Sequence, residues 1–170
     1  MTITDKMTFW FVVFGFYWFI SVISTSDSSI PAFFIGTYYF LPGVVLPLIV
    51  FLTHKKSFDI SFLYYEMISL VIYYSAVWIF SLERVWNGFT YIAPFLGGFL
   101  FVFATNRFMI KSYKAGNALI GGILSSSCFT VLLLTTDKIS FAIACFLWTL
   151  FVGLLIDYSI NSQSENRGQK

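Results

Sequence analysis

Residues 60–82 have the sequence ISFLYYEMISLVIYYSAVWIFSL, which carries one charged side chain, that of Glu66. A helix needs about 20 mainly apolar residues to cross the hydrocarbon core of a bilayer. This stretch is apolar on every side, whereas a strand of a membrane barrel alternates polar and apolar residues. We therefore predict that it is a transmembrane helix.

Five further stretches have the same character. We predict spans at residues 7–23, 32–52, 60–82, 89–110, 115–136 and 139–156. The whole chain is 58% hydrophobic and 11% charged, and a soluble domain would carry about twice that share of charged residues. The predicted fold class is all-α, a polytopic transmembrane helical bundle of about six spans.

The chain is predicted to hold one domain. Residues 1–157 form the transmembrane part, and the polar tail 158–170 is expected to be disordered. Residues 7–23 could instead be the apolar core of a signal peptide, since small residues follow at 24–26. The residues before this core have no net charge and no Ala-x-Ala site follows, so we favour a retained first helix.

The positions of Lys and Arg predict the orientation. With the N-terminus inside, eight of the ten lie in cytoplasmic segments, and only Arg84 and Lys138 lie outside. Cytoplasmic loops of membrane proteins carry such an excess. We therefore expect both termini in the cytoplasm, an even number of spans, and a multi-pass protein of the bacterial inner membrane.

Glu66 is the one ionisable residue well inside a predicted span, and such residues usually face the protein interior and have a partner. The third and fourth spans form a hairpin whose turn is centred near Trp86. Reflecting position 66 through that turn leads to Asn106 and Arg107. We predict a buried ion pair between Glu66 and Arg107.

Ser69 and Tyr73 follow Glu66 at helical spacings of three and seven residues, so the three share one face. With Asn106 they form a candidate polar face directed inward. Three interpretations stand: the predicted pair fixes helix register alone, Glu66 binds a cationic or polar ligand or relays a proton, or the Glu66 side chain extends to the membrane interface.

The second span contains Pro42, Gly43 and Pro47. Proline removes a backbone donor and clashes with the preceding turn, so we expect a kink or break here. Broken helices often line transport sites, although a kink that serves packing alone is the commoner case.

Small residues form a stripe on the fifth span at Ala118, Gly122 and Ser126. This spacing lets two helix backbones approach closely. We expect a helix-packing face, either within the bundle or against a partner or a second copy.

No motif for catalysis, a metal or a cofactor occurs, so we predict none of these and no enzymatic activity. The net charge of +2 does not favour nucleic-acid binding. We predict a non-catalytic membrane protein that docks its helices or loops onto a partner membrane protein, as accessory, immunity or exclusion factors do. The alternative is a small-molecule binding or transport component built around Glu66 and the broken helix. The lipid bilayer surrounds the protein in either case.

Overall fold

The computed structural model describes residues 3–24, 32–53, 60–82, 86–110, 115–133 and 138–168. They form six α-helices and no strand, which confirms the all-helical class. The helices are α1 (Ile3–Ser24), α2 (Ala32–Thr53), α3 (Ile60–Ser81), α4 (Phe89–Thr105), α5 (Ala115–Cys128) and α6 (Lys138–Gly168). Each predicted span overlaps one helix, and residues 134–136 of the fifth span lie outside the described residues.

Four of these helices are long and apolar enough to cross a membrane. The candidate spans are Lys6–Ile23, Ile60–Ser81, Phe89–Met109 and Ile139–Ile160. Large apolar side chains on their outer surfaces are exposed, for example those of Ile20, Val71 and Trp78. Lipid is the natural solvent for such surfaces, so the structure is that of a helical membrane protein.

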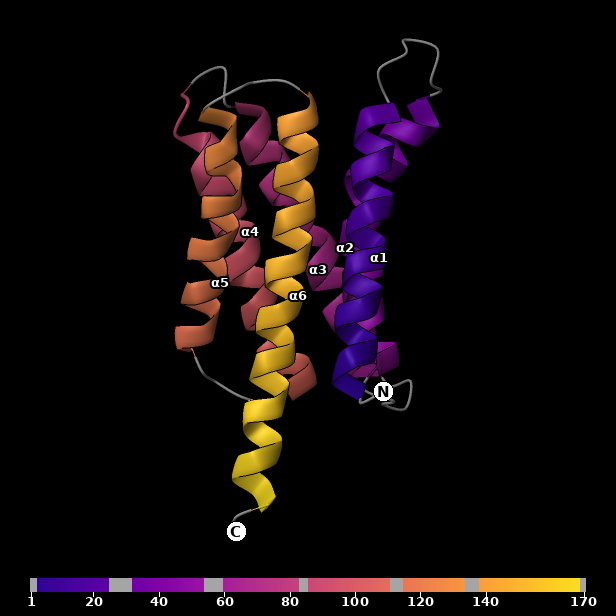
Figure 1. Ribbon diagram of the computed structural model, residues 1–170, viewed down its shortest axis with the longest axis vertical. Coiled ribbons are helices and arrows are strands. Elements are labelled where there is room, and N and C mark those ends of the chain that lie inside the picture. The colour runs from indigo at the N-terminus through magenta and orange to yellow at the C-terminus, as the bar shows by residue number, and fades with distance from the viewer. Residues whose placement is uncertain are drawn as a thin grey trace.

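The helices form a closed ring in which each packs against its sequence neighbours and α6 packs against α1. In Figure 1 they lie in two layers, with α5, α6 and α1 in front of α4, α3 and α2. Successive helices run in opposite directions, so both ends of the chain lie at the same end of the bundle. The helices α3 and α6 are therefore the middle members of facing layers.

Glycines allow close approach at two seams of the ring. A Cβ atom added at Gly98 of α4 would overlap the Ser125 side chain of α5 and meet the Gly121 carbonyl oxygen at 2.8 Å. A Cβ atom at Gly153 of α6 would meet the Phe11 ring of α1 at 2.6 Å. Helices in lipid associate through such close van der Waals packing, because the hydrophobic effect does not drive them together.

Two helices change type near one end. After Thr105, whose Oγ1 donates to the Phe101 carbonyl oxygen at 2.8 Å, α4 passes into the π-helical turn Asn106–Ile110. After Cys128, α5 passes into the 3-10 segment Phe129–Leu133. Hydroxyl groups that bond back to the preceding turn compete with the regular ladder and bend a helix. The fourth and fifth spans are thus helical without being uniform α-helices.

The predicted disordered tail is helical as far as the structure describes it. α6 continues without interruption to Gly168, which corrects the expectation for residues 158–168. Asn117 Nδ2 of α5 donates to Ser159 Oγ at 2.8 Å, and Ile160 packs against the core. The sequence has no proline or glycine between Asp157 and Gly168. This stretch therefore lacks the two residue types that most strongly disfavour a helix.

Candidate functional site

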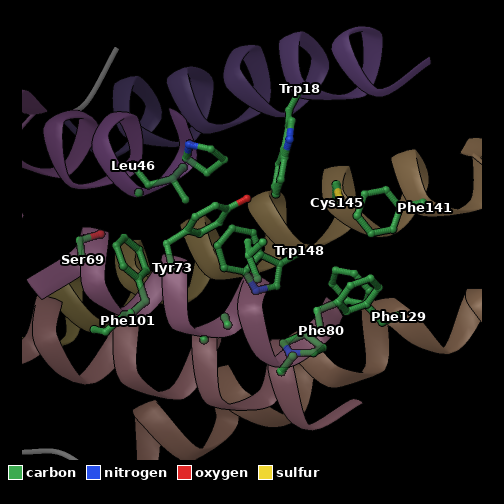
Figure 2. Close-up of a pocket in the computed structure, with 18 residues that line it drawn as sticks. Trp18, Leu46, Ser69, Tyr73, Phe80, Phe101, Phe129, Phe141, Cys145 and Trp148 are labelled. Atoms are coloured by element: carbon green, nitrogen blue, oxygen red, sulfur yellow. The ribbon is translucent and has the colours of Figure 1, made fainter. Parts of the chain in front are cut away.

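A cavity of about 80 Å³ lies between the two layers of the bundle. Five helices and the segment Phe129–Leu133 form its wall, and α5 does not reach it. The lining is almost entirely apolar and is rich in aromatic rings (Figure 2). Small-molecule sites are concave, mostly apolar spaces with few polar groups. The cavity is therefore the candidate site of this protein.

Three rings from three helices meet in the middle of the cavity wall. Trp18 of α1, Tyr73 of α3 and Trp148 of α6 form this set, which we call the tryptophan triad. Its ring centroids are 6.2 Å apart for Trp18 and Tyr73, 6.0 Å for Trp18 and Trp148, and 6.4 Å for Tyr73 and Trp148. The rings are tilted or edge-to-face, the arrangements in which aromatic quadrupoles attract.

A second set of three rings closes one end of the cavity. It consists of Phe80 of α3, Phe129 of the 3-10 segment Phe129–Leu133, and Phe141 of α6. We call this set the phenylalanine triad. The centroid distances are 5.9 Å for Phe80 and Phe129, 5.7 Å for Phe80 and Phe141, and 6.1 Å for Phe129 and Phe141. Each triad thus joins α3 to α6 through side chains.

The two triads share one helix register. Phe80 lies seven residues after Tyr73 on α3, and Phe141 lies seven residues before Trp148 on the antiparallel α6. Seven residues are two helical turns, or roughly 10 Å along the axis. The same heptad step therefore places a ring on both helices at two levels, and these rings hold the middle helices apart.

Small side chains lie between the triads and leave the space empty. Ala76 follows Tyr73 on α3, Cys145 precedes Trp148 on α6, and Gly97 faces them from α4; all three line the cavity. A Cβ atom added at Gly97 would meet the Ala76 Cβ at 3.2 Å. The cavity thus results from large rings at two levels and small residues at the level between them.

The far end of the cavity holds an unsatisfied polar group. Figure 2 shows Ser69 with Leu46 and Phe101 at the end opposite Phe80 and Phe141. Ser69 is 1% exposed, and its Oγ has no hydrogen-bond partner in the described part of the protein. A buried hydroxyl without a partner costs about 1–3 kcal/mol. The site is therefore apolar along its length and polar at one end.

A hydrogen bond between α3 and α4 sets the level of these helices. Tyr65 Oη lies 2.7 Å from Thr105 Oγ1, and both residues are fully buried. The single hydroxyl hydrogen of Thr105 is donated to the Phe101 carbonyl oxygen. Tyr65 is consequently the donor in the pair. Reflection through Trp86 predicted this level of contact between the two helices, but not these residues.

The predicted ion pair of Glu66 and Arg107 is not formed between these two described residues. Glu66 is half-buried, and its buried Oε2 has no hydrogen-bond partner in the described part of the chain. Arg107 is exposed, and its Cζ lies 6.0 Å from the Phe108 ring centroid. Successive residues on a helix point about 100° apart. Because Tyr65 and Thr105 face each other, Glu66 and Arg107 are turned away.

The candidate polar face is present in part. Ser69 and Tyr73 both line the cavity, while Glu66 lies one turn beyond Ser69 and does not contribute to the wall. Asn106 is 2% exposed, and neither of its amide atoms has a hydrogen-bond partner among the described residues. Polar atoms of Glu66, Ser69 and Asn106 thus lack hydrogen-bond partners in the described part of the protein. They lie on α3 and in the turn after α4, toward the end of the bundle that holds both termini.

The predicted helix break does not occur. α2 is a continuous helix through Pro42, Gly43 and Pro47, all of which are buried. Pro42 and Gly43 line the cavity, and a Cβ atom at Gly43 would meet the Tyr73 Cβ at 3.1 Å. Close packing against α3 supports the helix where proline removes backbone hydrogen bonds.

The small-residue stripe packs inside the bundle. Ala118 and Gly122 are buried, and a Cβ atom at Gly122 would meet the Phe95 ring of α4 at 2.9 Å. Ser126 is only half-buried, and its neighbour Ser125 takes the buried position against Gly98. The face predicted from the sequence therefore serves the α4–α5 seam.

The aromatic triads are the part of the site that sequence reasoning missed. Their signal was the repeated spacing of seven between rings in the third and sixth spans. Elsewhere in the described residues, no three His, Cys, Asp or Glu side chains are grouped as metal ligands. Cys128 and Cys145 are buried free thiols.

Comparison with known proteins finds no matching family model, no similar curated protein and no similar solved structure.

Proposed function

Since no relative supplies a function, we propose that this protein binds a small apolar molecule, no larger than one ring, within the membrane. The proposed role is that of a non-catalytic binding or transport component. The observation that carries the proposal is the cavity between the tryptophan and phenylalanine triads. An apolar space of this kind stays dry, and a ligand that fills it gains contacts that water does not make.

The size of the cavity limits the ligand. An engineered apolar cavity of about 150 Å³ binds benzene or xenon, and drug-sized ligands need about 300–1,000 Å³. The cavity here is about 80 Å³, so one aromatic ring is the upper limit and requires small side-chain movements.

Titration with benzyl alcohol tests the proposal, because two tryptophans of the wall report on occupancy. We expect a saturable change in tryptophan fluorescence of the purified protein. Cys145→Leu fills the cavity and should abolish the saturable change, whereas Cys128→Leu, at a buried cysteine outside the wall, should retain it. Equal behaviour of both variants, or a linear response without saturation, would contradict binding in the cavity.

We also propose that all six helices span the membrane and that both termini are cytoplasmic. α2 has 22 residues, a length of about 33 Å. α5 and the 3-10 segment together supply 14 and 5 residues, or about 31 Å. Both lengths match a hydrocarbon core of about 30 Å. The excess of Lys and Arg on the termini side supports a cytoplasmic face and a bacterial inner membrane.

Labelling of single introduced cysteines in intact cells tests this topology. Cysteines placed at residues 56 and 112 should be protected from an impermeant reagent, and one at residue 136 should react. Reaction at residues 56 and 112 would reverse the orientation. The two native cysteines are buried and should remain silent.

A docking role has a different observation in its favour. α3 exposes an apolar stripe at Ile60, Met67, Val71, Tyr74 and Trp78. A bilayer covers such a face as well as a partner helix does, so the cavity and not the stripe carries our proposal. Val71→Trp together with Met67→Trp should leave function intact if lipid covers the stripe, and abolish it if a partner does.

A further inference from the structure

We infer that the cavity selects a cationic ligand, a small ammonium compound whose ring lies in the cavity and whose charged group points toward Ser69 and Glu66. This inference rests on the proposed binding function and adds the chemical class of the ligand. It requires three features: a hydrogen-bonding group at one end of the cavity, a nearby negative charge, and aromatic faces beside it.

The hydrogen-bonding group is Ser69. Its hydroxyl is 99% buried, since the residue is 1% exposed, and it lines the cavity without a hydrogen-bond partner among the described residues. A purely apolar ligand would leave this hydroxyl unsatisfied. A ligand with an N–H or O–H group at one end of its ring would satisfy it.

The negative charge is supplied by Glu66. It precedes Ser69 by three residues on the same face of α3, about 4.5 Å along the helix axis. Its Oε2 is buried and has no hydrogen-bond partner in the described structure. A carboxylate in this environment is costly unless a cation or donor reaches it. A ligand bound beside Ser69 would bring that cation.

The aromatic faces belong to the tryptophan triad. Tyr73 follows Ser69 by one turn on α3, and Trp18 and Trp148 surround it. The π faces of Trp and Tyr attract cations electrostatically, and sites for quaternary ammonium ligands are built from such rings. Along α3 the order is therefore carboxylate, hydroxyl and aromatic cage.

The same wall disfavours an anion. Among the residues that the structure describes, no Lys, Arg or His lines the cavity. Arg107, the basic residue nearest in the hairpin, has an exposed side chain. A carboxylate ligand would face Glu66 without a compensating charge. A neutral ligand would fit between the aromatic rings but would bring no positive charge to the Glu66 carboxylate.

Three ligands with one ring and different charge test the inference: benzylamine, benzyl alcohol and benzoate, titrated near neutral pH. We expect benzylamine to bind about tenfold more tightly than benzyl alcohol. Its ammonium group would gain both a contact with the aromatic faces and an ion pair with the Glu66 carboxylate. Benzoate should bind most weakly. Glu66→Gln should remove most of this preference, leaving the part that the aromatic rings supply, and should leave the affinity for benzyl alcohol unchanged.

Controls separate charge from structure. Asp157→Asn removes a carboxylate outside the cavity wall and should keep the preference for benzylamine. Glu66→Asp retains the charge and should keep most of the preference, which covers the case in which Glu66→Gln does not fold. Ser69→Ala should weaken both benzylamine and benzyl alcohol and leave toluene binding unchanged.

The outcomes are distinct. Equal affinities for benzylamine and benzyl alcohol would overturn the cationic class, and a preference that Glu66→Gln does not diminish would overturn the role of Glu66, while the proposed cavity function stands in both cases. Tightest binding of benzoate would overturn the cationic class as well. Saturable binding of none of the probes would overturn both this inference and the proposed function.

Discussion

Replacing Thr105 with valine is expected to destabilise the bundle more than replacing Tyr65 with phenylalanine. The two hydroxyls are 2.7 Å apart, and Thr105 also donates to the Phe101 carbonyl oxygen at 2.8 Å. Tyr65→Phe removes one hydrogen bond, and Thr105 keeps its own donor satisfied. We expect a loss of about 0.5–1.5 kcal/mol in the free energy of unfolding.

Thr105→Val has a larger effect because it leaves the Tyr65 hydroxyl with no acceptor. Tyr65 is fully buried, so its stranded donor costs about 1–3 kcal/mol. The double variant removes both hydroxyls and should be more stable than Thr105→Val alone. If the hydrogen bond stabilises the bundle, the losses of the two single variants therefore add up to more than the loss of the double variant.

Unfolding of the purified protein in mixed micelles with increasing SDS measures these free energies. Ser81→Ala serves as the control, because Ser81 is exposed and its Oγ donates only to the Trp78 carbonyl oxygen within the same helix. We expect this control to change stability by less than about 0.5 kcal/mol. Tyr65→Phe as costly as Thr105→Val, with additive effects in the double variant, would refute the hydrogen bond and its direction.

Two further predictions concern packing. Gly98→Ala should destabilise the α4–α5 seam by about 1–3 kcal/mol, since its Cβ would overlap Ser125. Gly116→Ala should be neutral or slightly stabilising, because its Cβ meets nothing within 4 Å. Equal losses of stability in the unfolding assay would contradict the close approach of α4 and α5. Cys145→Leu should leave stability unchanged or raise it, because the leucine fills the cavity. Cys128→Leu should cost about 1–3 kcal/mol by overpacking. A loss of stability in Cys145→Leu as large as that in Cys128→Leu would show that the cavity beside Cys145 has no free space.

The depth of residues in the bundle was predictable from the sequence. Span lengths place each helix end, and reflection through the turn near Trp86 brings position 66 to the level of position 106. The Tyr65–Thr105 bond confirms that level. The direction in which each side chain points was not predictable, because a rotation of about 100° per residue separates neighbours at nearly equal depth. For this reason the sequence suggested Glu66 and Arg107, while the structure pairs Tyr65 with Thr105.

Helix continuity was misjudged for local reasons. Pro42 and Pro47 predict a break when α2 is considered alone, yet packing against Tyr73 and Leu70 at Gly43 supports a continuous helix. Tertiary contacts thus outweigh the intrinsic preference of proline. The helical tail beyond residue 157 follows the same logic, since Asn117 of α5 bonds to Ser159.

The cavity depends on a contact between helices that are distant in sequence. α3 and α6 face each other only because the ring closes between α6 and α1. No charge or hairpin relation links these two helices in the sequence. The heptad spacing of Tyr73 with Phe80 and of Phe141 with Trp148 becomes meaningful once the two helices are antiparallel partners.

Xenon binding tests the central claim most directly, because xenon enters dry apolar cavities without needing a polar group or a charge. Crystals of the protein pressurised with xenon should show an anomalous peak between the tryptophan and phenylalanine triads, beside Cys145 and Ala76. The peak should be lost in Cys145→Leu and kept in Cys128→Leu. Xenon found only on the lipid-facing surface, with none between the triads, would contradict the account.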